Sequence, residues 1–95
     1  MGRRAKHVVT DARDIARIEE LAVRMTNGTR VRITRRDGEI FTGVVAEIPN
    51  VQIFEDADGN EGINAVVRLE EPSVPPWTVY LWLDEIETVE TLDAG

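Results

Sequence analysis

Hydrophobic and polar residues alternate over residues 30–48, RVRITRRDGEIFTGVVAEI, and this pattern predicts a β-hairpin. Asp37-Gly38 lies at its centre and is typical of a two-residue type I′ turn, because both residues tolerate positive φ. Such a loop pairs Arg36 with Glu39, and directly opposed residues point to the same face. The register therefore predicts a core face that consists of Val31, Ile33, Ile40, Thr42, Val44, Ala46 and Ile48.

The opposite face of the hairpin differs between its two strands. On the first strand it is polar, with Arg30, Arg32, Thr34 and Arg36. The second strand is apolar on both faces, which is typical of a strand that is buried or strongly bent. Gly43 marks a position where this strand can bend or let another backbone approach.

An amphipathic helix is predicted at about residues 11–26. Thr10 or Asp11 can cap its first turn, and Asn27-Gly28 predicts its end, since glycine readily takes the left-handed conformation found there. Residues 1–9 are expected to form a flexible basic arm. The apolar stripe of the helix recurs at spacings of three and four and consists of Ile15, Ile18, Leu21, Ala22 and Met25.

Four further apolar stretches predict the remaining strands. Residues 51–54 form a short strand or continue the second strand past a bend at Pro49-Asn50, and a polar loop follows at residues 55–62. Residues 63–71 predict the next strand, and residues 86–92 predict the last. Residues 77–83, WTVYLWL, give the strongest signal and send apolar side chains to both faces, so an edge position would offer unpaired backbone to a partner.

Charge is distributed unevenly along the chain. Ten of the 11 Lys and Arg lie in residues 1–36 with only four of the 18 acidic residues, which leaves the remainder strongly acidic. This asymmetry favours either a basic surface for nucleic acid or two complementary halves that meet within or between subunits. The formal net charge of −7 argues against strong non-specific nucleic-acid binding, which scales with the number of phosphates neutralised.

Few catalytic or metal-binding arrangements fit this sequence. The absence of Cys excludes disulfides and thiolate chemistry and suits a reducing, cytoplasmic compartment. His7 has no second histidine for a metal, and Asp56 to Asn60 resemble the start of a calcium loop that fails at Glu61 and Val67. No apolar run approaches the roughly 20 residues of a membrane span. We therefore expect a protein that is not an enzyme, with no metal, cofactor or membrane anchor.

The predicted order of elements resembles the Sm-like (LSm) fold of RNA-associated ring proteins. The resemblance rests on the helix followed by VRITRRDGEIFTGVVAEI with Gly43 in its bent strand, on INAVVRLEE with Asn64, and on VYLWLDEIETVETL. It implies a mainly β fold with one N-terminal α-helix, a small strongly bent five-stranded Sm-like barrel over residues 10–95. An SH3-like barrel of different connectivity is the alternative. The chain is also similar to a small group of uncharacterised bacterial proteins described as a variant Sm-like motif.

Two functional hypotheses remain open on sequence grounds. The resemblance implies RNA association, although the usual uridine-pocket motif is incomplete and uridine binding does not carry over. The alternative is a protein-interaction or self-assembly module without nucleic-acid binding, which would form a homo-oligomer through the strand Trp77 to Leu83. The candidate single-stranded RNA contacts combine guanidinium and ammonium groups with an amide and an aromatic ring: Arg3, Arg4, Lys6, Arg30, Arg32, Arg35, Arg36, Asn64 and Trp77.

Overall fold

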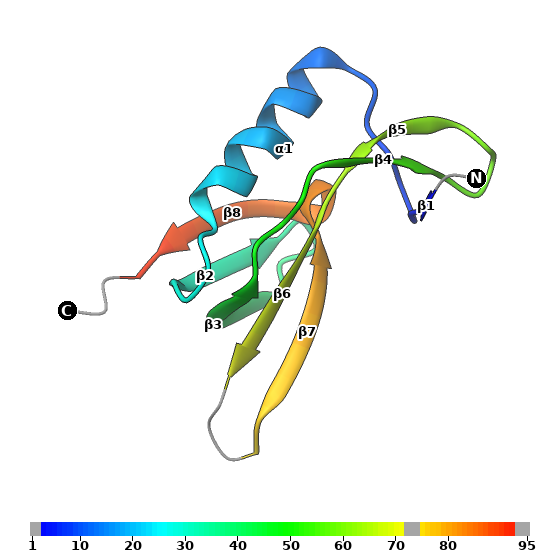
Figure 1. The fold of residues 1–95 in the computed structure, drawn as a ribbon. Coiled ribbons are helices and arrows are strands. Elements are labelled where there is room, and N and C mark those ends of the chain that lie inside the picture. Colours follow the sequence, from blue (N-terminus) through cyan, green and yellow to red (C-terminus); the bar gives the residue numbers. More distant parts are fainter. Residues whose placement is uncertain (1–2, 72–74, 93–95) are drawn as a thin grey trace.

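Two β-sheets and one α-helix make up the fold, which a computed structural model describes for residues 3–71 and 75–92 (Figure 1). Helix α1 spans Ala12–Arg24, and a short 3₁₀ turn, η1, spans Leu83–Glu85. The strands are β1 (Arg3–Arg4), β2 (Arg30–Arg35), β3 (Ile40–Glu47), β4 (Gln52–Glu55), β5 (Glu61–Asn64), β6 (Val66–Glu71), β7 (Trp77–Trp82) and β8 (Ile86–Thr91).

The larger sheet has five antiparallel strands in the order β7-β6-β3-β2-β8, and the smaller has three in the order β1-β4-β5. The prediction of a mainly β fold with one N-terminal helix is confirmed. The closed barrel is wrong, because among the described residues β7 and β8 each pair with one neighbour only.

One long bent hairpin supplies strands to both sheets. β3 pairs with β6 in the larger sheet, and its continuation β4 pairs with β5 in the smaller one. Pro49 and Asn50 separate β3 from β4, since proline has no N–H to donate. Ala65 separates β5 from β6 on the other side of the hairpin. Residues 51–54 therefore continue the second strand past a bend, and the strand predicted at 63–71 is divided in two.

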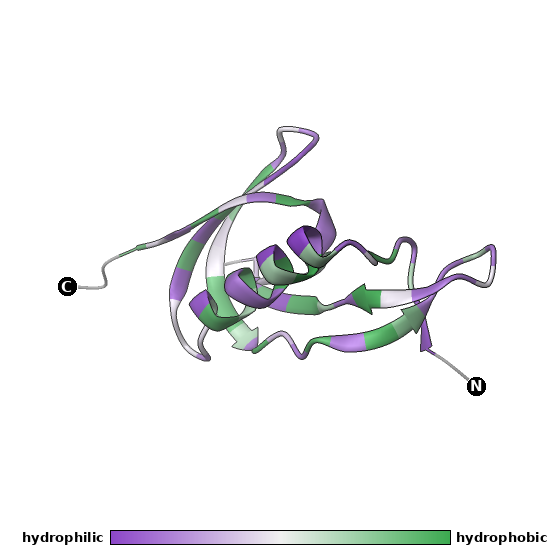
Figure 2. Ribbon diagram, turned by 90° about the horizontal axis from the view of Figure 1, so that it is seen from above, coloured by the Kyte–Doolittle hydropathy of each residue, from purple (hydrophilic) through white to green (hydrophobic). Residues whose placement is uncertain are grey.

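Helix α1 packs its apolar stripe on the sheets. It begins after Asp11, and the chain turns away at Gly28, whose φ is 83°. Figure 2 shows hydrophilic and hydrophobic residues alternating around the helix. The Arg17 guanidinium donates to the carbonyl oxygens of Ile86 and Glu87 and so ties α1 to β8. The core consists of Ile18, Leu21, Met25, Val31, Ile33, Val45, Ala65, Val67, Leu69, Leu81, Leu83, Ile86 and Val89.

The β2–β3 hairpin is shifted by one residue from the predicted register. The backbone N–H of Arg35 donates to the Glu39 carbonyl, and that of Gly38 donates to the Arg35 carbonyl. The loop therefore has three residues rather than two, with Gly38 at a φ of 93°. Val31 pairs with Gly43 instead of Val44, and such a shift moves the side chains of one strand to the opposite face.

The consequence is a different core face on β3. Val31 and Ile33 are fully buried as predicted, because the first strand alternates cleanly. On β3 the buried positions are Gly43 and Val45, whereas Ile40 is 58% exposed. The remaining members of the predicted face are either exposed, as Ile48 is, or only partly buried, as are Thr42, Val44 and Ala46.

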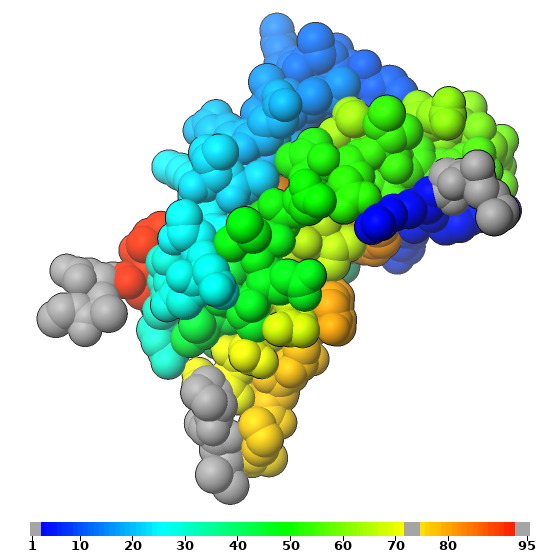
Figure 3. All heavy atoms as spheres, in the orientation of Figure 1, coloured from blue at the N-terminus to red at the C-terminus, as the bar shows by residue number. Residues whose placement is uncertain are grey.

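Residues 3–9 lie against the smaller sheet and are not the free arm that the sequence predicts (Figure 3). β1 runs parallel to β4, and the backbones of Val9 and Ile63 exchange two hydrogen bonds. The approach requires glycine, because a Cβ on Gly62 would lie 2.7 Å from the Val9 carbonyl oxygen. Within residues 3–71 and 75–92, no helix is long and apolar enough to cross a membrane.

Candidate functional site

The arginines at the start of β2 each face a carboxylate. Arg30 Nη1 lies 3.4 Å from Glu71 Oε2, and Arg32 Nη1 lies 2.9 Å from Glu90 Oε1. Exposed pairs of this kind contribute about 1 kcal/mol or less to stability. Their effect on binding is larger, because a phosphate must compete with a carboxylate already beside each guanidinium. The two oppositely charged parts of the chain thus meet within one subunit.

Arg35 is held by three acidic side chains. Its Nη1 lies 2.9 Å from Glu39 Oε1, and its Nη2 lies 2.9 Å from Glu85 Oε1. Burial opposes the charged form, but the hydrogen bond to Glu39 and the charges of Asp37 and Glu85 outweigh it and raise the pKa of Arg35. Its guanidinium thus joins β2, the hairpin loop and η1.

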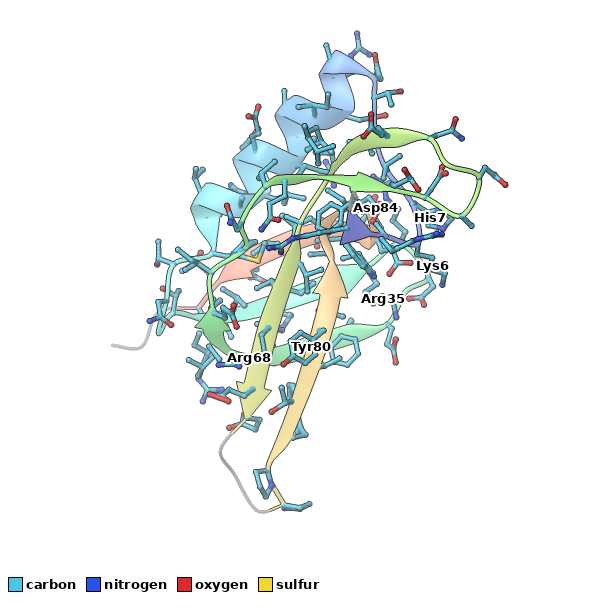
Figure 4. The ribbon with its side chains drawn as sticks, turned by 45° about the vertical axis from the view of Figure 1, so that its right-hand side comes forward. Lys6, His7, Arg35, Arg68, Tyr80 and Asp84 are labelled. Atoms are coloured by element: carbon cyan, nitrogen blue, oxygen red, sulfur yellow. The ribbon has the colours of Figure 1, made fainter. Side chains whose placement is uncertain are left out.

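Arg36 and Lys6 gather on the same side of the molecule. Arg36 Nε donates to the Asp84 carbonyl oxygen at 3.0 Å, and its Nη1 lies 3.7 Å from Glu87 Oε2. Lys6 Nζ lies 3.8 Å from Glu85 Oε2. Figure 4 shows Lys6 near Arg35 and Asp84. The structure therefore brings Lys6, Arg35 and Arg36 together, as one group of mixed charge rather than a basic patch.

Asn64 is fully buried, and its side chain forms hydrogen bonds to three separate segments of the chain. Its Nδ2 donates to the His7 carbonyl oxygen at 2.8 Å and to Asp84 Oδ1 at 2.9 Å. Its Oδ1 accepts from the backbone N–H of Ala65 at 2.8 Å and from that of Asp84 at 3.4 Å. The donors and acceptor of its side-chain amide all have partners within the protein, and Asn64 thereby links the N-terminal segment, β5 and η1.

Trp77 lies at the start of β7 in the larger sheet and is 36% exposed. Its ring lies 6.3 Å from that of Phe41 at an interplanar angle of 59°. Gly43 permits this contact, because a Cβ there would lie 3.1 Å from Trp77 Cη2 and 3.0 Å from the Glu70 carbonyl oxygen. Gly43 was predicted to let the strand bend or to let another backbone approach. In the structure it allows the Glu70 backbone and the Trp77 ring to approach closely.

Arg3 lies apart from the other candidates, at a cavity of about 190 Å³ between the two sheets. Arg68 and Tyr80 line the same cavity and are direct cross-strand partners on β6 and β7 (Figure 4). The Tyr80 hydroxyl, and then the charges of Glu47 and Glu70, raise the pKa of Arg68 against the effect of its burial. Arg4 is exposed at the end of β1.

Little in the local sequence marks Arg68 as a site residue. It is the single basic residue after position 36, and this isolation is the one signal that could have marked it. Its partnership with Tyr80 depends on the β6–β7 register, which crosses a proline-rich connection and cannot be counted from a turn. Arg3 was expected in a free arm, so its place beside Arg68 also depends on long-range pairing.

These features define the class of protein. A strongly bent sheet beneath an N-terminal helix matches the crystal structure of XC5848 from Xanthomonas campestris, described as adopting a novel variant of Sm-like motif, with a TM-score of 0.91. The two proteins are 30% identical over 98% of this chain and 100% of that one. The fold is therefore a variant of the Sm-like motif, as the sequence resemblance implies.

The family follows from the whole chain. Residues 2–92 match the family model described as Domain of unknown function (DUF3247), and the protein belongs to this family. No curated protein matches the chain. Fold and family are thus shown.

Proposed function

We propose that the protein is a non-enzymatic Sm-like module that associates with a second copy of itself through strand β7. The observation that carries the proposal is the position of β7 at an open edge of the five-stranded sheet. Figure 3 shows this strand along an outer margin of the molecule. An edge strand presents a row of unpaired N–H and C=O groups, which is a template for pairing with another strand.

The composition of β7 supports pairing. Edge strands are commonly protected by charged residues or by proline within the strand. Charged residues make up 31% of the whole chain, yet the six residues of β7, WTVYLW, include none. The other edge strand, β8, carries Glu87 and Glu90. β7 is therefore the less protected edge.

The backbone geometry identifies which groups would pair. The N–H of Leu83 donates to the Ala65 carbonyl oxygen, and the same register continues along β6 and β7. Because backbone groups alternate in direction along an antiparallel strand, Thr78, Tyr80 and Trp82 direct their N–H and C=O groups away from β6. Three residues thus offer donors and acceptors to a partner strand.

RNA association through the hairpin arginines is the weaker proposal. Arg30, Arg32, Arg35 and Arg36 each have a carboxylate within 3.7 Å. A single-stranded RNA would have to displace these carboxylates, and the net charge of the chain adds repulsion at longer range. The charge pairing therefore favours self-association over RNA as the main activity.

Sedimentation of a variant blocked at the edge tests the proposal. Thr78→Pro removes one outward N–H without removing a hydrogen bond to β6, and proline is tolerated at such edge positions. Thr78→Val removes the hydroxyl but keeps the N–H, and serves as the matched control. We expect the unmodified protein and Thr78→Val to form oligomers at high concentration and Thr78→Pro to remain a monomer.

The mass also distinguishes the arrangement. Pairing of β7 with β7 of a second copy closes a dimer, whereas pairing of β7 with β8 of a second copy generates a larger ring or an open chain. A monomer at all concentrations, or oligomers that persist in a folded Thr78→Pro variant, would contradict assembly through β7. Circular dichroism of Thr78→Pro verifies that the variant is folded.

A further inference from the structure

The cavity between the two sheets combines apolar and polar walls. It lies where the long hairpin bends from β3 to β4, and its volume is about 190 Å³. Phe54 supplies part of the apolar wall and is held in place by an edge-to-face contact with Trp82, at a centroid distance of 5.3 Å. The polar lining comes from Arg3, Glu47, Asn50, Gln52, Arg68 and Tyr80.

Arg68 is the central charged group of this cavity. Its Nη1 lies 3.6 Å from Oε2 of Glu47, whose side chain is largely exposed, so the ion pair contributes little to stability. Its Nε is buried and has no hydrogen-bond partner among the described residues. Buried donors normally have an acceptor. The present contacts thus leave this guanidinium incompletely satisfied.

Arg3 brings a second guanidinium to the same cavity. The parallel pairing of β1 with β4 places Arg3 beside Phe54. Arg3 is exposed, and no ion pair holds it within residues 3–71 and 75–92. Arg3 differs in this respect from the hairpin arginines and from Arg68, each of which has a carboxylate within 3.7 Å. The charged residues that line the cavity are two arginines and one glutamate, so the lining carries a net positive charge on an acidic protein, and guanidinium forks suit phosphate.

Tyr80 adds a flat aromatic surface next to Arg68. Tyr80 on β7 is directly opposite Arg68 on β6 (Figure 4), and Tyr80 is 63% exposed. Exposed aromatic rings beside basic groups are platforms on which nucleobases stack. The side-chain amides of Asn50 and Gln52 line the same cavity and have both donors and acceptors for the edge of a base.

We propose that this cavity binds a nucleoside monophosphate group, with its phosphate between Arg3 and Arg68 and its base against Tyr80. A phosphopeptide would use the two guanidinium groups alone and leave the ring and amides unused. The same chemistry can come from a free nucleotide or from one residue of a single-stranded RNA. The site is separate from the hairpin arginines and does not depend on pairing through β7.

Titration with AMP and UMP, followed by two-dimensional NMR, tests the proposal. We expect shifts confined to the cavity, including the Arg68 Nε–H signal and the Tyr80 ring, with inorganic phosphate binding at least tenfold more weakly. Tyr80→Leu keeps the backbone N–H but removes the ring, and should weaken binding about tenfold, within the range for a stacked base. Arg68→Gln should weaken it at least as much, and Arg68→Lys should restore it only in part.

Arg13→Gln is the control, since Arg13 is an exposed helix residue outside the cavity lining. It should leave nucleotide affinity unchanged. If a hexameric oligoribonucleotide binds more tightly than UMP and loses affinity with Tyr80→Leu, the ligand is a strand; equal affinity indicates a free nucleotide. The proposal is overturned if neither AMP nor UMP binds at about 10 mM, a concentration at which even weak binding would be detected. It is also overturned if Tyr80→Leu and Arg68→Gln bind the nucleotides as well as the unmodified protein does, or if a phosphotyrosine peptide binds more tightly than either nucleotide.

Discussion

The side-chain amide of Asn64 donates to Asp84 Oδ1 at 2.9 Å, although the two residues are 20 positions apart. The contact joins the end of β5 to the 3₁₀ turn between β7 and β8. The same amide holds the His7 carbonyl, so one buried side chain fixes three segments. The resemblance to the Sm-like fold suggests that this asparagine contacts a ligand. In this structure its side-chain amide instead forms hydrogen bonds within the protein.

Replacement of Asn64 should therefore destabilise the fold. Asn64→Ala leaves the Asp84 carboxylate and the His7 carbonyl without this donor, and the backbone N–H of Ala65 without its acceptor. We expect a loss of about 3 kcal/mol in the free energy of unfolding, measured with urea. Asn60→Ala, at an exposed asparagine in the β4–β5 loop, is the control and should cost far less. A loss below about 0.5 kcal/mol for Asn64→Ala would mean that these hydrogen bonds do not contribute.

Gly62 should be intolerant of any side chain while the N-terminal segment is in place. In Gly62→Ala the new Cβ would lie 2.7 Å from the Val9 carbonyl oxygen and 2.9 Å from Val8 Cβ. We expect a loss of about 1–3 kcal/mol and faster hydrogen exchange at the Ile63 amide, which donates to Val9. Deletion of residues 2–9 should abolish the difference between glycine and alanine. An unchanged Ile63 exchange rate in Gly62→Ala would contradict the close approach.

Neutralising the carboxylate partners of Arg32 and Arg36 should expose these two arginines to RNA. In Glu87→Gln/Glu90→Gln, Arg36 and Arg32 lose their carboxylates. We expect single-stranded RNA affinity at low salt to rise on the order of tenfold with a steeper dependence on salt, measured by fluorescence anisotropy. Asp58→Asn/Glu61→Gln changes the net charge equally and should have a smaller effect. Equal affinities of the unmodified protein and Glu87→Gln/Glu90→Gln would show that the arginines are already accessible.

The pKa of the Asp56 carboxyl should lie below the ordinary value for aspartate. Its carboxylate accepts from the backbone N–H of Asn60 at 2.9 Å, which lowers the pKa of the Asp56 carboxyl from 3.8. Because the pKa is lower in the folded state, the contribution to stability is present above the unfolded pKa and is lost as pH falls through the folded one. NMR titration of the Asp56 carboxyl should give a midpoint below 3.8. The midpoint should also lie below 3.8 in Asn60→Ala, because this variant keeps the backbone N–H that donates to Asp56. A midpoint at or above that value would contradict this hydrogen bond.

The elements of the fold could be predicted from local patterns, whereas the register and the closure could not. The apolar stripe of the helix is a local feature and was correct; the helix itself ends at Arg24, before the predicted stop, although Gly28 does have the positive φ expected of it. Asp37-Gly38 was interpreted as a two-residue loop, yet the chain places Arg36 in the loop as well, and this single residue reversed the face of β3. The sequence of a turn constrains loop length only weakly when polar residues flank it.

The candidate site was only partly predictable for the same reason. Positive charge on β2 can be read from alternation, but the carboxylates that neutralise it come from β6, η1 and β8, far along the chain. The cavity at Arg68 and Tyr80 also requires the β6–β7 pairing and the attachment of residues 3–9. Local sequence carries no measure of such long-range contacts.

Hydrogen exchange along β7, compared at low and high protein concentration, tests self-association most directly. The outward amides of Thr78, Tyr80 and Trp82 should exchange rapidly in a dilute sample and become protected as concentration rises. The inward amides of Val79 and Leu81, which pair with β6, should be protected at both concentrations. Outward amides that exchange equally fast at every concentration would contradict assembly through this edge.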